Sequence, residues 1–188
     1  MAAEALRFFQ LGQIAAQDSG CTLTVAMLCA NEAWAYAILG DARQTTNFLA
    51  RAGDEFARAY GAMSAAWVRF FNDAEITALT GIAHLALSYA EPAYVQSART
   101  VLTQMVTARD ADMARSHAFD LTALATACFR DGDINDGVRF GWQAVAAADE
   151  LRSVRVNDRL RPLADALSVT VKMSSDAADL AHRLRACS

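Results

Sequence analysis

The chain has 188 residues, of which 54% are hydrophobic and 20% are charged, with a formal net charge of −4 at pH 7. Two prolines and nine glycines interrupt an alanine-rich sequence, a composition that favours helix and argues against an all-β fold or a long flexible linker. A net negative charge also disfavours an extended nucleic-acid surface, because phosphate is repelled. We therefore expect one all-α domain covering residues 1–188.

Apolar residues recur at three- and four-residue steps, the period of a helix with one packed face, and strand-like alternation is missing. The pattern predicts helices over residues 3–17, 23–39, 42–60, 64–71, 74–88, 92–109, 113–130, 135–151, 154–169 and 175–186. No apolar run is long enough to span a membrane, and Glu4 and Arg7 stand where a secretory leader would be apolar. We therefore expect a cytoplasmic chain.

The four cysteines are dispersed along the chain, without a C-x-x-C pair. We interpret Cys21, Cys29, Cys128 and Cys187 as small buried hydrophobes in a reducing compartment, with no structural disulfide. Lys172 is the single lysine among many arginines. Together with the alanine content, this bias indicates a GC-rich, actinobacterial genome.

Three short breaks divide the alanine-rich stretches: Gly40-Asp41, Gly132-Asp133 and the weaker Glu91-Pro92-Ala93. Three helix pairs around these breaks align with the tetratricopeptide repeat, a helix-turn-helix unit of about 34 residues. The match is degenerate, since Glu32 replaces the usual leucine and Thr45 the usual alanine. The expected fold is an all-α, tetratricopeptide-like α-solenoid of antiparallel helical hairpins.

The segments AWVRFFNDAE (66–75), RSHAFDL (115–121) and LRSVRVNDRL (151–160) resemble the C-terminal tetratricopeptide half of actinobacterial helix-turn-helix transcriptional regulators. The resemblance covers nearly the whole chain. It implies repeats that sense a ligand or mediate dimerisation. Met1 leads straight into the first repeat helix, without the family's DNA-binding domain before it, so two alternatives remain: an excised sensor domain or a stand-alone relative. In either case we expect no direct nucleic-acid binding by this chain.

In such repeats the first helix of each pair lines a concave face. The alignment predicts an apolar groove whose lining includes Met27, Ala83 and Leu87. Such a groove is expected to bind a small hydrophobic molecule or an amphipathic peptide. Trp34 has the alternative of filling the core, and the aromatic cluster at 67–71 has the alternative of replacing a missing repeat contact. The predicted ligand-binding residues are Asn31, Trp34, Ile38, Trp67, Phe70, Phe119, Thr122 and Thr126.

Two carboxylates follow the aromatic cluster, at Asp73 and Glu75. Side chains two residues apart on a helix do not face each other, so acid-base catalysis by this pair is disfavoured, and we expect Asp73 to cap the helix instead. Ser116, His117 and Asp120 lie too close together on one helix to form a catalytic triad.

His84, His117 and His182 belong to separate helices, which disfavours a metal site, and no phosphate-binding glycine loop occurs. We therefore expect no catalytic residue, no metal and no cofactor, and predict that the chain is not an enzyme.

Charge is uneven along the chain. Residues 1–150 contain 10 basic and 17 acidic side chains, whereas residues 151–188 contain 7 and 4. The basic cluster at Arg152, Arg155, Arg159 and Arg161 has three interpretations: a solvated or salt-bridged face, a nucleic-acid contact, or a surface for self-association or an acidic partner.

The leading hypothesis is a ligand- or peptide-sensing module of a transcriptional regulatory system. The competing hypothesis is an interaction scaffold or dimerisation domain, in which the first helix pairs across a two-fold axis. Phe8 and Phe9 point to different faces of that helix, so one of them is expected to lie outside the core. A third alternative is an accessory protein of a biosynthetic pathway.

Overall fold

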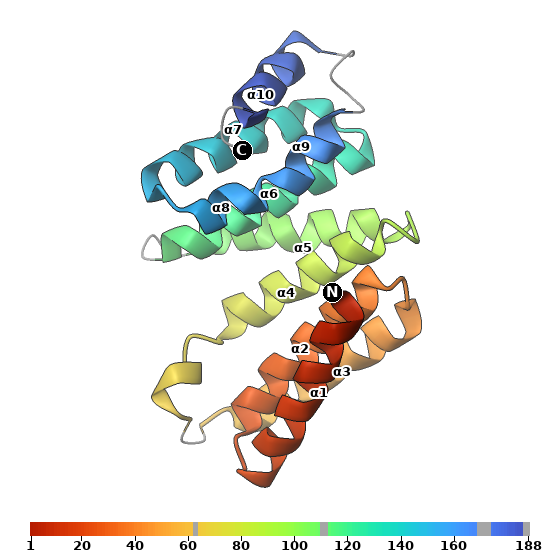
Figure 1. Ribbon diagram of the computed structural model, residues 1–188, viewed down its shortest axis with the longest axis vertical. Helices are drawn as coiled ribbons and strands as arrows, with labels where there is room; N and C mark the ends of the chain where they lie inside the picture. The colour runs from red at the N-terminus through yellow and green to blue at the C-terminus, as the bar shows by residue number, and fades with distance from the viewer. Residues whose placement is uncertain (62–63, 110–112, 169–173, 186–188) are drawn as a thin grey trace. The chain divides into compact units, whose positions relative to one another are not determined.

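The helices begin and end close to where the apolar periodicity places them. The computed structural model describes residues 1–61, 64–109, 113–168 and 174–185, and the regular secondary structure of these residues is helical, without a strand. The prediction of an all-α fold is thus confirmed for this part of the chain (Figure 1). The elements are α1 (Ala2–Asp18), α2 (Thr22–Ile38), α3 (Ala42–Ala59), the 3-10 helix η1 (Ala66–Val68), α4 (Asp73–Leu87), α5 (Tyr94–Ala108), α6 (Ala114–Asp131), α7 (Ile134–Leu151), α8 (Val154–Arg159), α9 (Arg161–Ser168) and α10 (Ser175–Arg185).

Both glycine-aspartate pairs end one helix and begin the next. Gly40 has φ +76°, a conformation that glycine adopts without strain, and the Asp41 N–H donates to the Tyr36 carbonyl at 3.0 Å. This bond is the six-to-one hydrogen bond of a Schellman C-cap. The Asp41 carboxylate then accepts from the Gln44 N–H at 2.9 Å and caps α3.

The same arrangement recurs between α6 and α7. Gly132 has φ +86°, the Asp133 N–H donates to the Cys128 carbonyl at 3.0 Å, and the Asp133 side chain accepts from the Asp136 N–H at 3.1 Å. At the third predicted break, α4 ends at Leu87 and α5 begins at Tyr94. The sequence prediction of three helix breaks is therefore confirmed.

The chain forms two compact units, Met1–Ser97 and Ala98–Ser188. In the first unit, α2 packs against α1, α3 and α4. Close packing is possible because the buried positions of α2 hold small side chains: Ala26, Ala30 and Ala33 are all 0% exposed. The prediction of a single domain over residues 1–188 stays a prediction.

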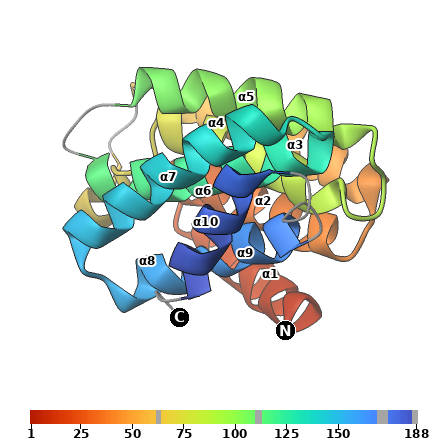
Figure 2. The ribbon, with the colours of Figure 1, turned by 90° about the horizontal axis from the view of Figure 1, so that it is seen from above.

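In the second unit, α6 packs against α7, α8 and α9, and α10 lies against α7 and α9 (Figure 2). Glycines allow the close approach of α7 to its neighbours. A Cβ atom added to Gly137 would lie 2.8 Å from the Phe129 ring, and one added to Gly141 would lie 2.5 Å from the Leu180 side chain. The Arg99 guanidinium joins α5 to the α6–α7 turn by hydrogen bonds to Asp131, Asp133 and Asp136.

Two predicted helices differ in the structure. Residues 64–71 form only the short 3-10 helix Ala66–Val68 rather than an α-helix. The predicted helix over 154–169 is divided at Leu160 into α8 and α9. Pro162 lies in the first turn of α9, where its missing N–H costs no helical hydrogen bond. Val169, at the predicted end, lies outside the described residues.

Capping of α4 also differs from the prediction. The N-cap is Asn72, whose Oδ1 accepts from the Glu75 N–H at 3.1 Å, and Asp73 is the first helical residue. Asp73 and Glu75 lie in the first turn, where carboxylates interact favourably with the helix dipole. Across the described residues, none of the helices has both the length and the apolar character needed to cross a bilayer.

Candidate functional site

Three predicted groove residues lie along α2. The Asn31 side-chain amide donates to the Met27 carbonyl at 2.8 Å, one turn earlier in the same helix. Trp34 is half-buried and packs against a small core cluster with Ala83 and Leu87, which agrees with the alternative of a core tryptophan. Ile38 ends the helix with 55% of its surface exposed.

The other predicted groove residues on helices lie in α6, in the second unit. Phe119 is half-buried, with the Arg159 guanidinium 5.3 Å from its ring centroid. Thr122 is buried and donates its hydroxyl to the Ala118 carbonyl, and Thr126 donates to the Thr122 carbonyl. Both hydroxyls are thus used within their own helix. These three residues belong to the second unit, whereas Asn31, Trp34 and Ile38 belong to the first.

The three aromatic residues of the cluster at 67–71 differ in burial. Phe71 is 2% exposed and packs edge-on against Phe56, with ring centroids 6.0 Å apart. Trp67 and Phe70 are exposed at 61% and 55%. One aromatic residue of the cluster therefore belongs to the core, as the packing interpretation requires, and two remain on the surface.

An open hollow of about 380 Å³ lies along the seam between α1 and α2, and Trp67 forms part of its wall. The size is at the lower end of the range for small-molecule sites. None of its lining residues is charged. They are Gly12, Ala15, Ala16, Ser19, Cys21, Thr24, Met27, Leu28 and Trp67.

Small side chains on α1 create this hollow, and sequence reasoning missed them. Gly12, Ala15 and Ala16 follow one another at helical spacing toward α2. A Cβ atom added to Gly12 would touch Leu28 at 3.4 Å, so the two helices run close there. The run of small residues was the available signal. Of the residues predicted for the groove, Met27 and Trp67 are the two that line this hollow.

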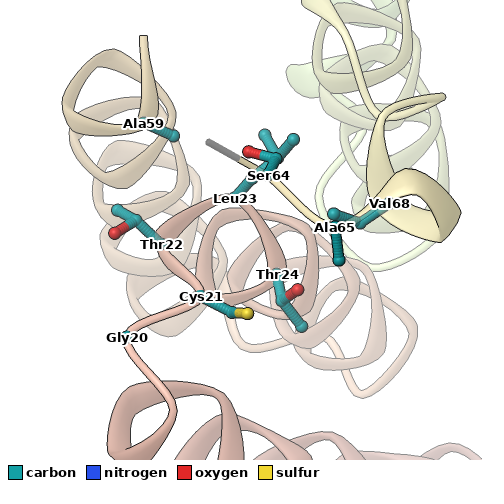
Figure 3. A pocket seen from close by; sticks show the side chains of 9 residues that line it. All are labelled: Gly20, Cys21, Thr22, Leu23, Thr24, Ala59, Ser64, Ala65 and Val68. Atoms are coloured by element: carbon teal, nitrogen blue, oxygen red, sulfur yellow. The ribbon is translucent and has the colours of Figure 1, made fainter. Parts of the chain in front are cut away.

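A second, smaller pocket of about 20 Å³ adjoins the first turn of α2 (Figure 3). Its volume corresponds to about one water molecule. Cys21 and Thr24 belong to the walls of both the pocket and the hollow, and the Cys21 thiol points toward Thr24 in Figure 3. The other residues that line the pocket are Gly20, Thr22, Leu23, Ala59, Ser64, Ala65 and Val68.

A buried carboxyl group belongs to α2 itself. Glu32 is 1% exposed, and neither carboxylate oxygen has a hydrogen-bond partner in the described structure. Burial raises the pKa of Glu32 to about 7, against the opposing charge of Arg51. The neighbouring Cys29 accepts from the Gln13 amide at 3.0 Å, and burial raises its pKa to about 11, which keeps the thiol protonated and unreactive at neutral pH.

The second unit contains a buried ion pair. The Arg109 guanidinium donates to the Asp120 carboxylate at 2.7 Å, and both side chains are almost fully buried. The pKa of the adjacent His117 is lowered by burial and by the charge of Arg109. Within the ranges that the structure describes, no three or more His, Cys, Asp or Glu side chains are grouped to hold a metal ion. Cys21, Cys29 and Cys128 are free thiols, and Cys187 lies outside these ranges.

The basic cluster is partly buried. Arg152, Arg155 and Arg161 are exposed around α8 and the start of α9, whereas Arg159 is half-buried over Phe119. Burial lowers the pKa of Arg159, with a further contribution from the charge of Arg155. A cation-π contact thus uses one of the four arginines within the unit.

Comparison with protein-family models, with curated proteins and with solved structures finds no match. Function is therefore inferred from the geometry and the sequence.

Proposed function

We propose that this protein is a ligand-binding helical-repeat module of tetratricopeptide type, and that the α1–α2 hollow binds a small apolar molecule or an apolar peptide side chain. The observation that carries the proposal is the uncharged, open hollow of about 380 Å³ with Trp67 in its wall. An exposed indole beside a hollow lined by small residues offers a large apolar contact area to a ligand.

A sensing role in a transcriptional regulatory system is the second part of the proposal. It rests on the resemblance of residues 66–75, 115–121 and 151–160 to the repeat half of actinobacterial regulators. The hollow lies between two helices, so a ligand that binds one spacing of α1 and α2 better than another shifts the population toward that spacing. Such a shift is the minimum that a sensor requires.

Titration with an uncharged apolar dye, N-phenyl-1-naphthylamine, tests binding in the hollow. We expect Trp67→Ala to weaken dye binding about fivefold to tenfold, which corresponds to roughly 1 to 1.4 kcal/mol. Ala15→Phe fills the hollow from α1 and is expected to abolish binding. Dye fluorescence measures both effects.

The matched control is Phe70→Ala, which removes an equally exposed aromatic side chain that does not line the hollow. Its dye affinity is expected to equal that of the wild type. Dye binding that survives Ala15→Phe, or that falls equally in Phe70→Ala and Trp67→Ala, contradicts the proposed site.

An interaction scaffold is the second proposal, and the exposed apolar side chains of α1 support it. Phe8, Leu11 and Ile14 are 66%, 64% and 57% exposed on this helix. Large apolar side chains gathered on one helix are typical of protein–protein contact sites. Phe9 is half-buried, so Phe8 is the phenylalanine that lies outside the core.

A further inference from the structure

One side of α1 combines large and small side chains. Phe8 and Leu11 are 66% and 64% exposed, and Ala15 is exposed as well. These three residues follow one another at steps of three and four, the spacing of a helix seam that packs against a second helix. The seam therefore has a bulky ring at Phe8 and, two turns later, a single methyl group at Ala15.

The hollow between α1 and α2 opens beside the small end of this seam. Gly12, Ala15 and Ser19 line it from α1. Phe8 precedes Gly12 by one turn on the same side of the helix but does not line the hollow of its own chain. The hollow measures about 380 Å³, whereas a cavity of roughly 150 Å³ holds a benzene molecule. A phenylalanine ring from elsewhere thus fits the hollow in size, and it fits in polarity because no charged residue lines the hollow.

Two copies of α1 can exchange these rings. A two-fold axis perpendicular to the helix makes the two copies antiparallel. With Leu11 near the axis, Phe8 of each copy comes level with Ala15 of the other. The large side chain of one helix then faces the small side chain of the second, as knobs-into-holes packing requires. Both hollows are filled at once, so the contact closes with two copies.

The charges along α1 fit the same register. Arg7 and Asp18 are exposed, and neither forms an ion pair with another described residue. When Phe8 is level with Ala15, Asp18 of the second copy lies two residues, or about 3 Å, along the helix axis from Arg7. Glu4 precedes Arg7 by one turn, so the Arg7 guanidinium has a carboxylate of each copy within reach. A parallel pair would instead place Arg7 beside Arg7, which is unfavourable.

We propose that the hollow is occupied by the Phe8 side chain of a second copy of this chain, in an antiparallel two-fold dimer of α1 helices. This inference rests on the proposed function of the hollow as a site for an apolar side chain. Trp67, which is 61% exposed in the wall of the hollow, packs against the incoming ring. A free apolar ligand has to displace that ring, so ligand binding and dimerisation oppose each other.

Sedimentation equilibrium of the full chain measures dimerisation. Phe8→Ala is expected to weaken the dimer about a hundredfold, because each dimer loses two buried rings. Ala15→Phe fills the hollow from its own chain and is expected to have a similar effect. The matched control Phe70→Ala removes an exposed ring outside α1 and is expected to leave dimerisation unchanged. Circular dichroism of each variant shows that the helices persist.

Reversal of charge tests the register. Arg7→Asp brings carboxylates of the two copies together and is expected to weaken the dimer about threefold to tenfold. The double variant with Arg7→Asp and Asp18→Arg restores the pair and is expected to return the affinity to within about twofold of the wild type. Arg43→Asp is the matched control, since it makes the same change at an exposed position on α3.

Dye titration separates this inference from the proposed function. At a protein concentration that keeps the wild type dimeric, Phe8→Ala is expected to bind N-phenyl-1-naphthylamine about tenfold more tightly than the wild type, because no ring competes for the hollow. Three results each overturn the inference and leave the apolar site standing: a wild type that is monomeric up to about 1 mM, a dimer that survives Phe8→Ala, or a double variant that fails to restore the dimer. Dye binding that is insensitive to Ala15→Phe overturns both.

Discussion

Glu32 stands where the repeat pattern has a leucine, and the structure places it in the core of the first unit. It is 1% exposed, and neither oxygen is hydrogen-bonded within the described residues. Arg51 is the cation whose charge acts on it, and Cys29 and Glu55 share its surroundings. The carboxyl is tolerated because burial favours the protonated, uncharged form.

Glu32 makes stability fall as pH rises. The folded state holds the Glu32 proton up to a pKa of about 7, whereas the ordinary value is 4.5, so the unfolded chain releases the proton first. The free energy of unfolding contributed by this group therefore decreases between about pH 4.5 and 7, by up to about 3 kcal/mol. Glu32→Gln cannot ionise and is expected to be increasingly more stable than the wild type across that window.

Urea unfolding at intervals from pH 4.5 to 8 measures the difference. A constant difference between Glu32→Gln and the wild type at every pH would show that Glu32 titrates normally. The sequence already marked Glu32 and Thr45 as departures from the repeat pattern. Both side chains are 1% exposed, and this burial is produced by the neighbouring helices.

At the scale of the helices, glycine has two distinct uses in this chain. Gly40 and Gly132 adopt positive φ at helix ends, which the sequence revealed because each precedes an aspartate. Gly137 lies inside α7, where the Phe129 ring leaves no space for a Cβ atom. Gly53 is inside α3 with no atom within 4 Å of a Cβ position.

These two helical glycines should respond oppositely to alanine. Gly137→Ala forces the Phe129 ring to move and is expected to destabilise the protein by about 1 to 3 kcal/mol, less the gain in helix propensity. Gly53→Ala meets no obstacle and is expected to stabilise it by about 0.5 to 1 kcal/mol. Chemical denaturation of the pair gives both values. Destabilisation by Gly53→Ala would show that a contact absent from this structure covers α3.

A network of charges fixes the α6–α7 turn. Arg99 on α5 binds Asp131, Asp133 and Asp136, and hydrogen bonds from the Asp136 backbone and from Arg99 lower the pKa of Asp133. The periodicity predicted both helices of this hairpin. It contained no sign that an arginine 32 to 37 residues away would bind the turn, because ion pairing between distant residues has no sequence period.

At the scale of the whole molecule, the exposed apolar side chains of α1 carry the proposal that the chain associates with itself. Phe8, Leu11 and Ile14 are exposed at spacings that place them on one side of the helix. A second copy of the chain presents the same face, so a two-fold contact between α1 helices would bury both sets of side chains.

Phe8→Glu tests this association. If the wild type forms a dimer through α1, the variant is expected to be monomeric, because a buried carboxylate at the centre of the contact lacks a partner. Light scattering gives the mass, and circular dichroism shows that the helices persist. Tyr60→Glu is the matched control, since Tyr60 is 88% exposed but outside α1. A dimer that survives Phe8→Glu places the contact elsewhere.

The sequence by itself determined the all-helical class, most helix boundaries and the three breaks between helices, because helix periodicity, glycine at C-caps and aspartate at N-caps are local properties of the chain. Only the tertiary structure decided which residues form the hollow. Thr122 and Thr126 were predicted for a groove, but their hydroxyls bond to their own helix. Gly12 and Ala15 were overlooked, since a small side chain makes a cavity only when a second helix and Trp67 enclose it.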